Sequence, residues 1–475
     1  MMFRKDLSSL NNQSISLLVV ICMMQVLLIA VPFYFHDFLS VILVLIVISG
    51  VGLFGSITLA VLYLCFIAAV IPTWVYDEIL KLPLDFKFYE GVFAFIIVLS
   101  GVAWLLSGRL NWPYKTRLDR PVLLLMGMLV FSIGLGLFYG QPVSQMLRDI
   151  RYPLCYSTFF IVTWFFDYRK CQMFLYLVIG ASVVVGIEYL IEFLAMVNLS
   201  VSGSFFRVAR LEGVLFPIGI LSIVAILLLE RHFYRRVLVG LASLPIGIAL
   251  LLTVGRGMWI ALFVGLSALG YLVLVDPLRR KERFKRFMIV ASIPFILIVF
   301  TYTFQMQTNV GVGDVAVRRI ARVADNYEED HSISGRLIVY GIALEEILKH
   351  PLFGGGHGVS IRILSTNVMP PRLETVGGVD SVYLTIAMRM GIVGVGVFLW
   401  VFCSGLWYAY KTFLSSEDEQ SRLFCMVFIA VYSALLVFGI GDATLFVNRL
   451  IFVHATFLGI LAKLDTEHIK QGKVA

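Results

Sequence analysis

The chain has 475 residues, of which 60% are hydrophobic and 14% are charged. Soluble domains carry roughly a quarter charged residues, and here the apolar runs extend from residue 14 to residue 463, too far for one aqueous core to bury them. The runs are continuous rather than alternating, which excludes an outer-membrane β-barrel. The 38 Lys and Arg residues form no stripe or arm, which argues against nucleic-acid binding.

About fourteen apolar runs have the length of a membrane helix, which needs ~20 residues. In chain order they cover residues 14–35, 38–55, 57–75, 88–108, 120–139, 150–166, 171–195, 213–229, 236–254, 257–275, 286–304, 382–410, 422–442 and 445–463. The runs 38–55 and 57–75 meet without an intervening charge, so one of them could be re-entrant. The pattern predicts an all-α polytopic membrane protein with about 12–14 transmembrane helices.

The basic residues predict the orientation of these helices. With the N-terminus in the cytoplasm, most Lys and Arg fall in short cytoplasmic loops, as the positive-inside rule requires, and the C-terminus is cytoplasmic as well. The expected parts are N-terminal transmembrane helices (1–304), a large periplasmic loop (305–381), C-terminal transmembrane helices (382–464) and a solvated cytoplasmic tail (465–475). Loops as long as the one at residues 305–381 usually carry function.

The large loop has helical patterning of its own. Ser334 is a candidate N-cap of a helix that ends at Pro351 and Gly354, and the segment VAVRRIARVADNY reads as a basic amphipathic helix on the outer membrane surface. We therefore expect the loop to contain short helices. The six cysteines show no CxxC or Cys/His spacing, so neither a disulfide framework nor a zinc site is indicated.

Charged side chains gather at the ends of helices that would face the periplasm. They are Arg148, Asp149, Arg151, Glu188, Glu192, Arg207, Arg210, Glu212, Arg256, Arg336, Asp380, Arg389, Asp442 and Arg449. Interfacial anchoring or mutual pairing explains most of them individually. Arg256 differs, because it lies between two spans in TVGRGMWIAL with a glycine on each side. A guanidinium binds phosphate oxygens bidentately, so a lipid-linked pyrophosphate suits this position.

Three segments together resemble a known superfamily. TVGRGMWIAL, SGRLIVYGIALEEILKHPLFGGGHG and DSVYLTIAMRMGIVGVGVFLW are similar, in order and spacing, to the bacterial O-antigen ligases and O-antigen polymerases. The motifs cover residues 236–400, and the many spans with one late periplasmic loop extend the resemblance to the whole chain. The resemblance implies a GT-C-like glycosyltransferase in which Arg256 and Arg336 contact the diphosphate of an undecaprenyl-linked glycan.

The chain departs from the ligase pattern at two positions. Ligases carry a His-Asn/Ser pair, nine residues and then GxxG, whereas here Asp380-Ser381 precedes Gly391-Ile392-Val393-Gly394 and Arg389 replaces an acidic residue. An aspartate can deprotonate the acceptor hydroxyl if desolvation raises its pKa from about 3.9 toward neutrality, or it can orient the hydroxyl while ionised. As an N-cap, Asp380 would have a purely structural role.

We therefore expect a glycosyltransferase of the bacterial inner membrane that transfers an undecaprenyl-diphosphate-linked glycan to a glycan hydroxyl at the periplasmic face. The substitution at Asp380 favours an O-antigen or exopolysaccharide polymerase, inverting and independent of metal and cofactor. The alternatives are a ligase acting on lipid A-core and, in another class, a lipid-linked oligosaccharide flippase, which would show related halves and a midplane site.

The site expectations name six residues. Asp380 is the catalytic candidate, Arg256 and Arg336 bind the diphosphate, and Arg210, His357 and Arg389 are candidate substrate contacts. His350 reads as a packing or capping residue. The expected partners are the lipid-linked donor, a glycan or lipid-glycan acceptor and the bilayer, with chain-length regulators or flippases as further candidates.

Overall fold

The computed structural model describes residues 56–76, 87–106, 116–199, 211–230, 232–253, 255–276, 283–288, 331–365 and 372–472. Within these ranges the regular structure is helical apart from one two-stranded sheet. The longer helices are α3 (Ile57–Val70), α4 (Phe88–Leu106), α5 (Asp119–Phe138), α6 (Val143–Ile150), α7 (Thr158–Phe165), α8 (Cys171–Leu199), α9 (Leu215–Leu229), α10 (Phe233–Thr253), α11 (Arg256–Val275), α14 (His331–Lys349), α15 (Val382–Ser415), α16 (Glu419–Phe438) and α17 (Ile451–Gly472). Three 3₁₀ turns, η3 (Pro153–Ser157), η4 (Tyr168–Lys170) and η5 (Leu211–Val214), precede α7, α8 and α9.

Eight helices of the described part of the chain are long and apolar enough to cross a membrane. They are α4, α5, α8, α9, α10, α11, α15 and α16, and each matches one of the expected runs. The chain is therefore a multi-pass membrane protein. The expected runs 14–35 and 38–55, and most of 286–304, lie outside the described residues, so a total of about 12–14 spans stays a prediction.

Three expected spans are shorter than their apolar runs or differ in their bounds. In the run 57–75, α3 ends at Val70, because Pro72 lacks the amide that a continued helix needs. The run 150–166 forms η3 and the short α7. The last helix, α17, begins at Ile451 rather than 445 and continues to Gly472, so most of the expected tail 465–475 is helical and not a free solvated segment.

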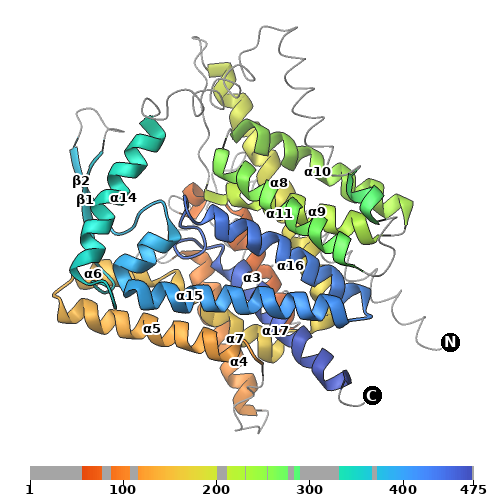
Figure 1. Ribbon diagram of the computed structural model, residues 1–475, viewed down its shortest axis with the longest axis horizontal. Helices are drawn as coiled ribbons and strands as arrows, with labels where there is room; N and C mark the ends of the chain where they lie inside the picture. Colours follow the sequence, from red (N-terminus) through yellow and green to blue (C-terminus); the bar gives the residue numbers. More distant parts are fainter. Residues whose placement is uncertain are drawn as a thin grey trace, which may run out of the picture.

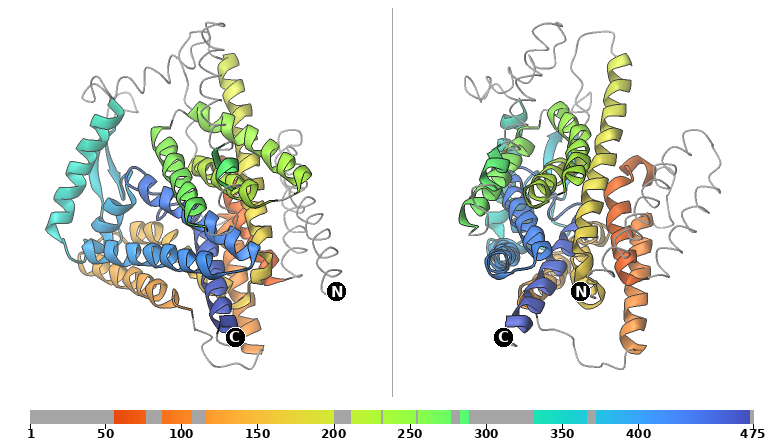
Figure 2. Two further views of the ribbon diagram at one scale, coloured as in Figure 1. Left: turned by 45° about the vertical axis from the view of Figure 1, so that its right-hand side comes forward. Right: turned by 90° about the vertical axis from the view of Figure 1, so that its right-hand side faces the viewer.

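α5 and α15 pack together, α8, α9, α10 and α11 form a second group, and α16 contacts helices of both groups (Figure 1). α15 lies against α5 and α16, while α16 also packs against α11 and α9, and α10 packs against α8 and α9. α9 and the first half of α17 are almost completely buried, whereas α4, α5 and α10 expose apolar side chains, as expected for lipid-facing helices. Figure 2 shows α8 extending beyond its neighbours at one end.

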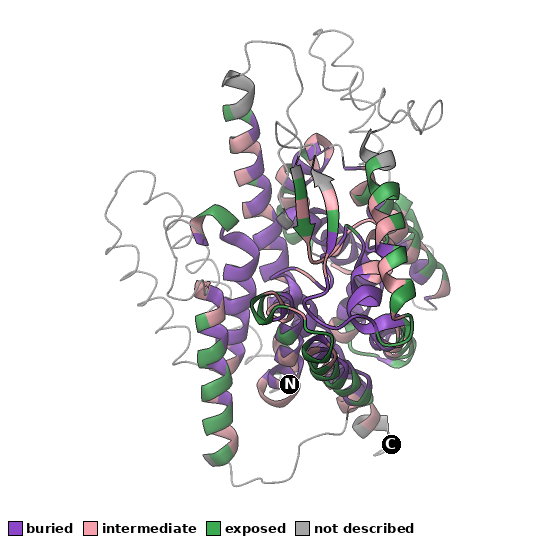
Figure 3. Ribbon diagram, turned by 90° about the vertical axis from the view of Figure 1, so that its left-hand side faces the viewer, coloured by how far each residue is buried: buried purple, intermediate pink, exposed green. Residues whose placement is uncertain are grey.

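The described part of the large loop forms a small unit on one end of α15. α14 packs against α15 and against β1 (Ile361–Ser365), which pairs antiparallel with β2 (Arg372–Val376). Ala343, Ile361 and Val379 belong to its own buried apolar cluster. The described residues of the loop contain one helix of 19 residues and a hairpin that the sequence did not predict, whereas the segment VAVRRIARVADNY lies outside the described residues. Figure 3 shows the hairpin and the exposed side of α14.

α15 is broken at Gly391, whose backbone angles (φ 65°, ψ −169°) suit glycine alone. The residues beside the break bond to the segment that follows α14. Ile392 and Val393 donate to the carbonyls of Pro351 and Leu352 at 2.9 and 3.2 Å. The carbonyls of Met388 and Arg389 accept from Gly355 and Gly356 at 2.8 and 3.1 Å, so the interrupted backbone stays fully paired at these positions.

Candidate functional site

The turn between α16 and α17, residues 439–442, fixes the start of α15. The amide of Val382 donates to the carbonyls of Gly439 and Asp442 at 2.9 and 3.1 Å. The Ser381 side chain is the N-cap and accepts from the amide of Leu384. Asp380 lies one residue before the cap, so the capping role that the sequence allowed for Asp380 belongs to Ser381.

The Asp380 side chain is 72% exposed and faces Arg336 of α14, with Oδ2 3.6 Å from Nε. Tyr340, one helical turn after Arg336, donates from its hydroxyl to the backbone carbonyl of Asp380 at 2.6 Å and to that of Ile440 at 3.1 Å. The hydroxyl thereby links α14, the start of α15 and the α16–α17 turn. A Cβ on Gly441 would lie 3.6 Å from Nη1 of Arg336, so this guanidinium rests against the same turn.

A second carboxylate, Asp442, lies in that turn and accepts hydrogen bonds from the amide and the hydroxyl of Thr444. Burial raises the pKa of Asp442, the negative charge of Asp380 raises it further, and the hydrogen bonds from Thr444 and the charge of Arg336 oppose the rise. We call Arg336, Tyr340, Asp380 and Asp442 the carboxylate–arginine site. It presents positive and negative groups side by side.

Arg256 is the first residue of α11, directly after its N-cap Gly255. The next residue, Gly257, approaches the end of α16 so closely that a Cβ there would lie 3.1 Å from the ring of Phe438. The start of α11 and the carboxylate–arginine site therefore meet the same end of α16. The fold brings all three sequence motifs to this end, although the first and the third lie more than a hundred residues apart in the chain.

The sequence model of the O-antigen ligase family matches residues 241–399. This range starts in α10, ends in α15 and includes Arg256, Arg336 and Asp380. The chain carries an O-antigen ligase family domain. The family transfers lipid-linked glycans in polysaccharide biosynthesis, so the protein is a glycosyltransferase of the ligase and polymerase type. No curated protein matches the chain.

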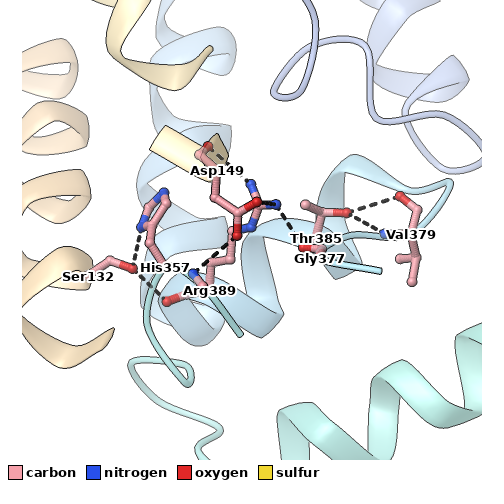
Figure 4. Close-up of polar contacts among 8 residues, drawn as sticks. Ser132, Asp149, His357, Gly377, Val379, Thr385 and Arg389 are labelled. Atoms are coloured by element: carbon pink, nitrogen blue, oxygen red, sulfur yellow. Dashed lines mark hydrogen bonds and ion pairs between the residues drawn. The ribbon is translucent and has the colours of Figure 1, made fainter. Parts of the chain in front are cut away.

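Two further residues of the O-antigen ligase domain, His357 and Arg389, are buried, and Figure 4 shows their polar contacts. The Arg389 side chain is 2% exposed and pairs with Asp149 of α6, with Nη2 3.0 Å from Oδ1. His357 is completely buried, and its Nδ1 lies 2.8 Å from the hydroxyl of Ser132 in α5. Burial, together with the smaller effect of the charge of Arg389, lowers the pKa of His357 to about 3, so the ring is neutral.

These positions bear on the residues named as candidate substrate contacts. In this structure His357 and Arg389 contact protein groups and reach no exposed surface, so their geometry favours a supporting role over a direct contact. A Cβ on Gly354 or Gly356 would lie within 2.5 Å of the backbone of α15 or α5, so these glycines permit close contact with the two helices. Arg210 lies outside the described residues.

Several other charged residues at this end form pairs, as the sequence led us to expect. Glu212 and Arg449 form a buried ion pair, and the Arg449 guanidinium also lies 5.0 Å from the centroid of the Tyr76 ring. Arg151 Nε is 2.8 Å from Glu90 Oε1. His350 stacks on the Tyr139 ring with centroids 4.3 Å apart, which confirms its interpretation as a packing residue.

Sequence reasoning missed the parts that Tyr340 and Asp442 play. Tyr340 stands among the apolar residues of the loop helix in the sequence, and nothing there signals the partners of its hydroxyl. Asp442 appeared among the charged helix ends without a partner assigned. Among the described residues, no group of three or more His, Cys, Asp or Glu side chains is arranged to hold a metal ion.

Proposed function

We propose that the protein is an inner-membrane polymerase that moves an undecaprenyl-diphosphate-linked glycan onto a hydroxyl of another glycan at the periplasmic face. The observation that carries the proposal is the exposed pairing of Asp380 with Arg336 beside the start of α11. This pairing places a carboxylate, which can bind the acceptor hydroxyl, next to guanidinium groups, which can bind the donor diphosphate.

The proposed reaction divides the work between the arginines and the aspartate. The acceptor oxygen attacks the anomeric carbon, the bond from that carbon to the diphosphate oxygen breaks, and the configuration inverts. Arg336 and Arg256 stabilise the negative charge that grows on the leaving diphosphate. Asp380 orients the acceptor hydroxyl and receives its proton. The positive charge comes from guanidinium groups, so the proposal needs no metal.

The pairing of Arg336 with Asp380 also suggests how donor binding prepares the site. Without substrate, the guanidinium partly neutralises the carboxylate. A diphosphate offers Arg336 more acceptor oxygens and more charge than one carboxylate does. When the donor diphosphate binds the Arg336 guanidinium, the Asp380 carboxylate is released to bind the acceptor. The Asp380 side chain is exposed, so its carboxylate can orient the acceptor hydroxyl without the desolvation considered from the sequence.

The alternatives differ from this proposal in acceptor or in reaction. A ligase would use the same donor contacts but transfer to lipid A-core, and Asp380 in place of the ligase histidine favours the polymerase. A flippase would form no glycosidic bond. The charges of the site lie at helix ends beside the large loop and not along helix middles, which favours transfer over transport.

The test is transfer by the purified protein from a synthetic undecaprenyl-diphosphate oligosaccharide, with and without lipid A-core, scored by product length. We expect chain growth without lipid A-core, loss of growth in Arg336→Ala, and retention in Arg120→Ala, which removes an exposed arginine at the start of α5. Products that require lipid A-core would establish the ligase. Donor movement across vesicles without new glycosidic bonds would overturn the proposal.

A further inference from the structure

Residues 377–381 connect β2 to α15 and carry Asp380. Of these five described residues, Asp380 alone has an exposed side chain. Buried groups fix the backbone before it. Arg389 donates from Nη2 to the carbonyl of Gly377 at 2.7 Å, and the Thr385 hydroxyl bonds both the amide and the carbonyl of Val379, at 3.1 and 3.0 Å. The position of the Asp380 carboxylate therefore depends on side chains one and two helical turns into α15.

Arg389 is in turn fixed by Asp149. Nη2 of Arg389 lies 3.0 Å from Oδ1 of Asp149, and the other carboxylate oxygen accepts from the amide of Gly358 at 3.1 Å. A Cβ on Gly377 would lie 3.1 Å from Oδ1, so the glycine lets the backbone come this close to the pair. One buried ion pair thus joins α6, the glycine segment 354–358 and the backbone before Asp380 (Figure 4).

The chemistry of the pair suggests a purpose beyond stability. Removing two charges from water costs free energy, and well-packed apolar residues often stabilise a protein at least as well as a buried ion pair does. An arginine offers five donors in a fixed plane, so one side chain can hold a carboxylate and a carbonyl in a set geometry. Here that carbonyl belongs to Gly377, three residues before the aspartate of the carboxylate–arginine site.

We propose that Asp149 and Arg389 are positioning residues, which fix the backbone of 377–381 so that the Asp380 carboxylate stays opposite Arg336. This rests on the proposed function, because it assumes that Asp380 acts in transfer. The pair sits behind the site and does not touch substrate. Loss of its geometry should therefore reduce kcat while leaving the contacts to the donor diphosphate intact.

Arg389→Lys tests the inference, because a lysine can keep the charge beside Asp149 but cannot reproduce the planar bridge to Gly377. We expect kcat to fall by about 10- to 100-fold, as for a small misplacement of a reacting group, with the donor KM changed by no more than about twofold. Thr385→Val, which removes the bonds to Val379 without touching a charge, should lower kcat in the same way and covers the case in which Arg389→Lys does not fold.

The matched control is Arg422→Lys. Arg422 is also buried and paired with an aspartate, Asp276, with Nη2 2.6 Å from Oδ1, but it lies at the opposite end of α16. A general cost of altering a buried arginine would lower the yield of both lysine variants and leave kcat per folded molecule unchanged. That result for Arg389→Lys and Thr385→Val would overturn the inference.

A geometric measurement separates this inference from the proposed function. In a cysteine-free background carrying Arg336→Cys and Asp380→Cys, a short bifunctional thiol reagent should link the two positions efficiently, and adding Arg389→Lys should lower the yield severalfold. An unchanged yield would overturn the positioning role whatever the activity. The other informative result combines two measurements. If Arg389→Lys lowers the cross-linking yield but the single variant Arg389→Lys keeps the parental kcat, the assumed role of Asp380 is overturned, and the reason for the positioning with it.

Discussion

Two neighbouring residues have different roles: Ser381 caps α15, and Asp380 is the carboxylate proposed to act on the acceptor. Both types cap helices well, so the sequence could place them at a helix start but could not decide which one caps. The choice depends on where α15 begins, and the bonds from Val382 to the carbonyls of Gly439 and Asp442 set that point. These partners lie some sixty residues later in the chain, beyond the reach of local sequence patterns.

His357 gives the protein a measurable pH dependence. Its pKa in the folded state is about 3, below the ordinary value of 6.5. Between these values the unfolded chain binds a proton that the folded chain does not, so stability falls as the pH drops below about 6.5. Lowering the pH from about 7.5 to about 5.5 should cost about 1.4 kcal/mol through this residue.

The measurement is the free energy of unfolding of the parent and of His357→Asn at both pH values. The asparagine can still bond the Ser132 hydroxyl but does not titrate, so the pH-induced loss should be smaller in the variant by about the same 1.4 kcal/mol. Equal losses in the two proteins would show that His357 is not held neutral in the folded state.

At the scale of the element, the break in α15 is the feature that shapes the site. The sequence indicated a GxxG packing motif here, and Gly391 does permit close contact, but with the backbone of the segment after α14. A Cβ on Gly391 would lie 2.2 Å from the carbonyl oxygen of Leu352. The break thus lets α15 receive the loop that carries α14 and Arg336.

Gly391→Ala should therefore destabilise the protein by at least about 1–3 kcal/mol, the cost of the backbone conformation alone. It should also reduce transfer, because the contact between α14 and α15 is disturbed. The control is Gly396→Ala in the same helix, where a Cβ would meet no atom within 4 Å and alanine favours the helix. Thermal unfolding with the two variants in parallel is the measurement. Equal midpoints would contradict the account of the break.

Helices and strands were not equally predictable. Long apolar runs identified all eight candidate membrane helices, because their length and composition are set by the bilayer itself. The hairpin was missed, because the alternation of apolar and polar residues at Ile361, Arg362 and Ile363 ends at Leu364 and is too short to indicate a strand. The end of α3 could be read from Pro72, but the late start of α17 depends on tertiary contacts of the α16–α17 turn.

At the scale of the whole molecule, the charged pairs of the described residues gather at two ends of the helices. Asp276 pairs with Arg283 and Arg422 at one end, while Glu212 with Arg449 and Arg336 with Asp380 lie at the other. An isolated charge in the bilayer costs free energy, so charged side chains lie near the membrane surfaces or pair with an opposite charge. The sequence could predict which charges share an end, but not how they pair.

We predict that the end with Asp380 faces the periplasm. In a cysteine-free background, Leu373→Cys of β2 should react with a membrane-impermeant thiol reagent in intact spheroplasts, whereas Glu417→Cys, between α15 and α16, should react after permeabilisation. Both positions are exposed, so accessibility within the protein does not limit either reaction. The reverse labelling pattern would place the site on the cytoplasmic side and remove the proposed substrate geometry.

The central claim is that Asp380 acts on the acceptor, and the rate of glycan transfer by Asp380→Asn tests it most directly. Asparagine keeps the size of the side chain but cannot take a proton, and Ser381 still caps the helix, so the fold should persist. We predict a fall of at least about 100-fold in kcat, while Glu345→Gln, an exposed carboxylate of α14, keeps the parental rate. Parental transfer by folded Asp380→Asn would contradict the account.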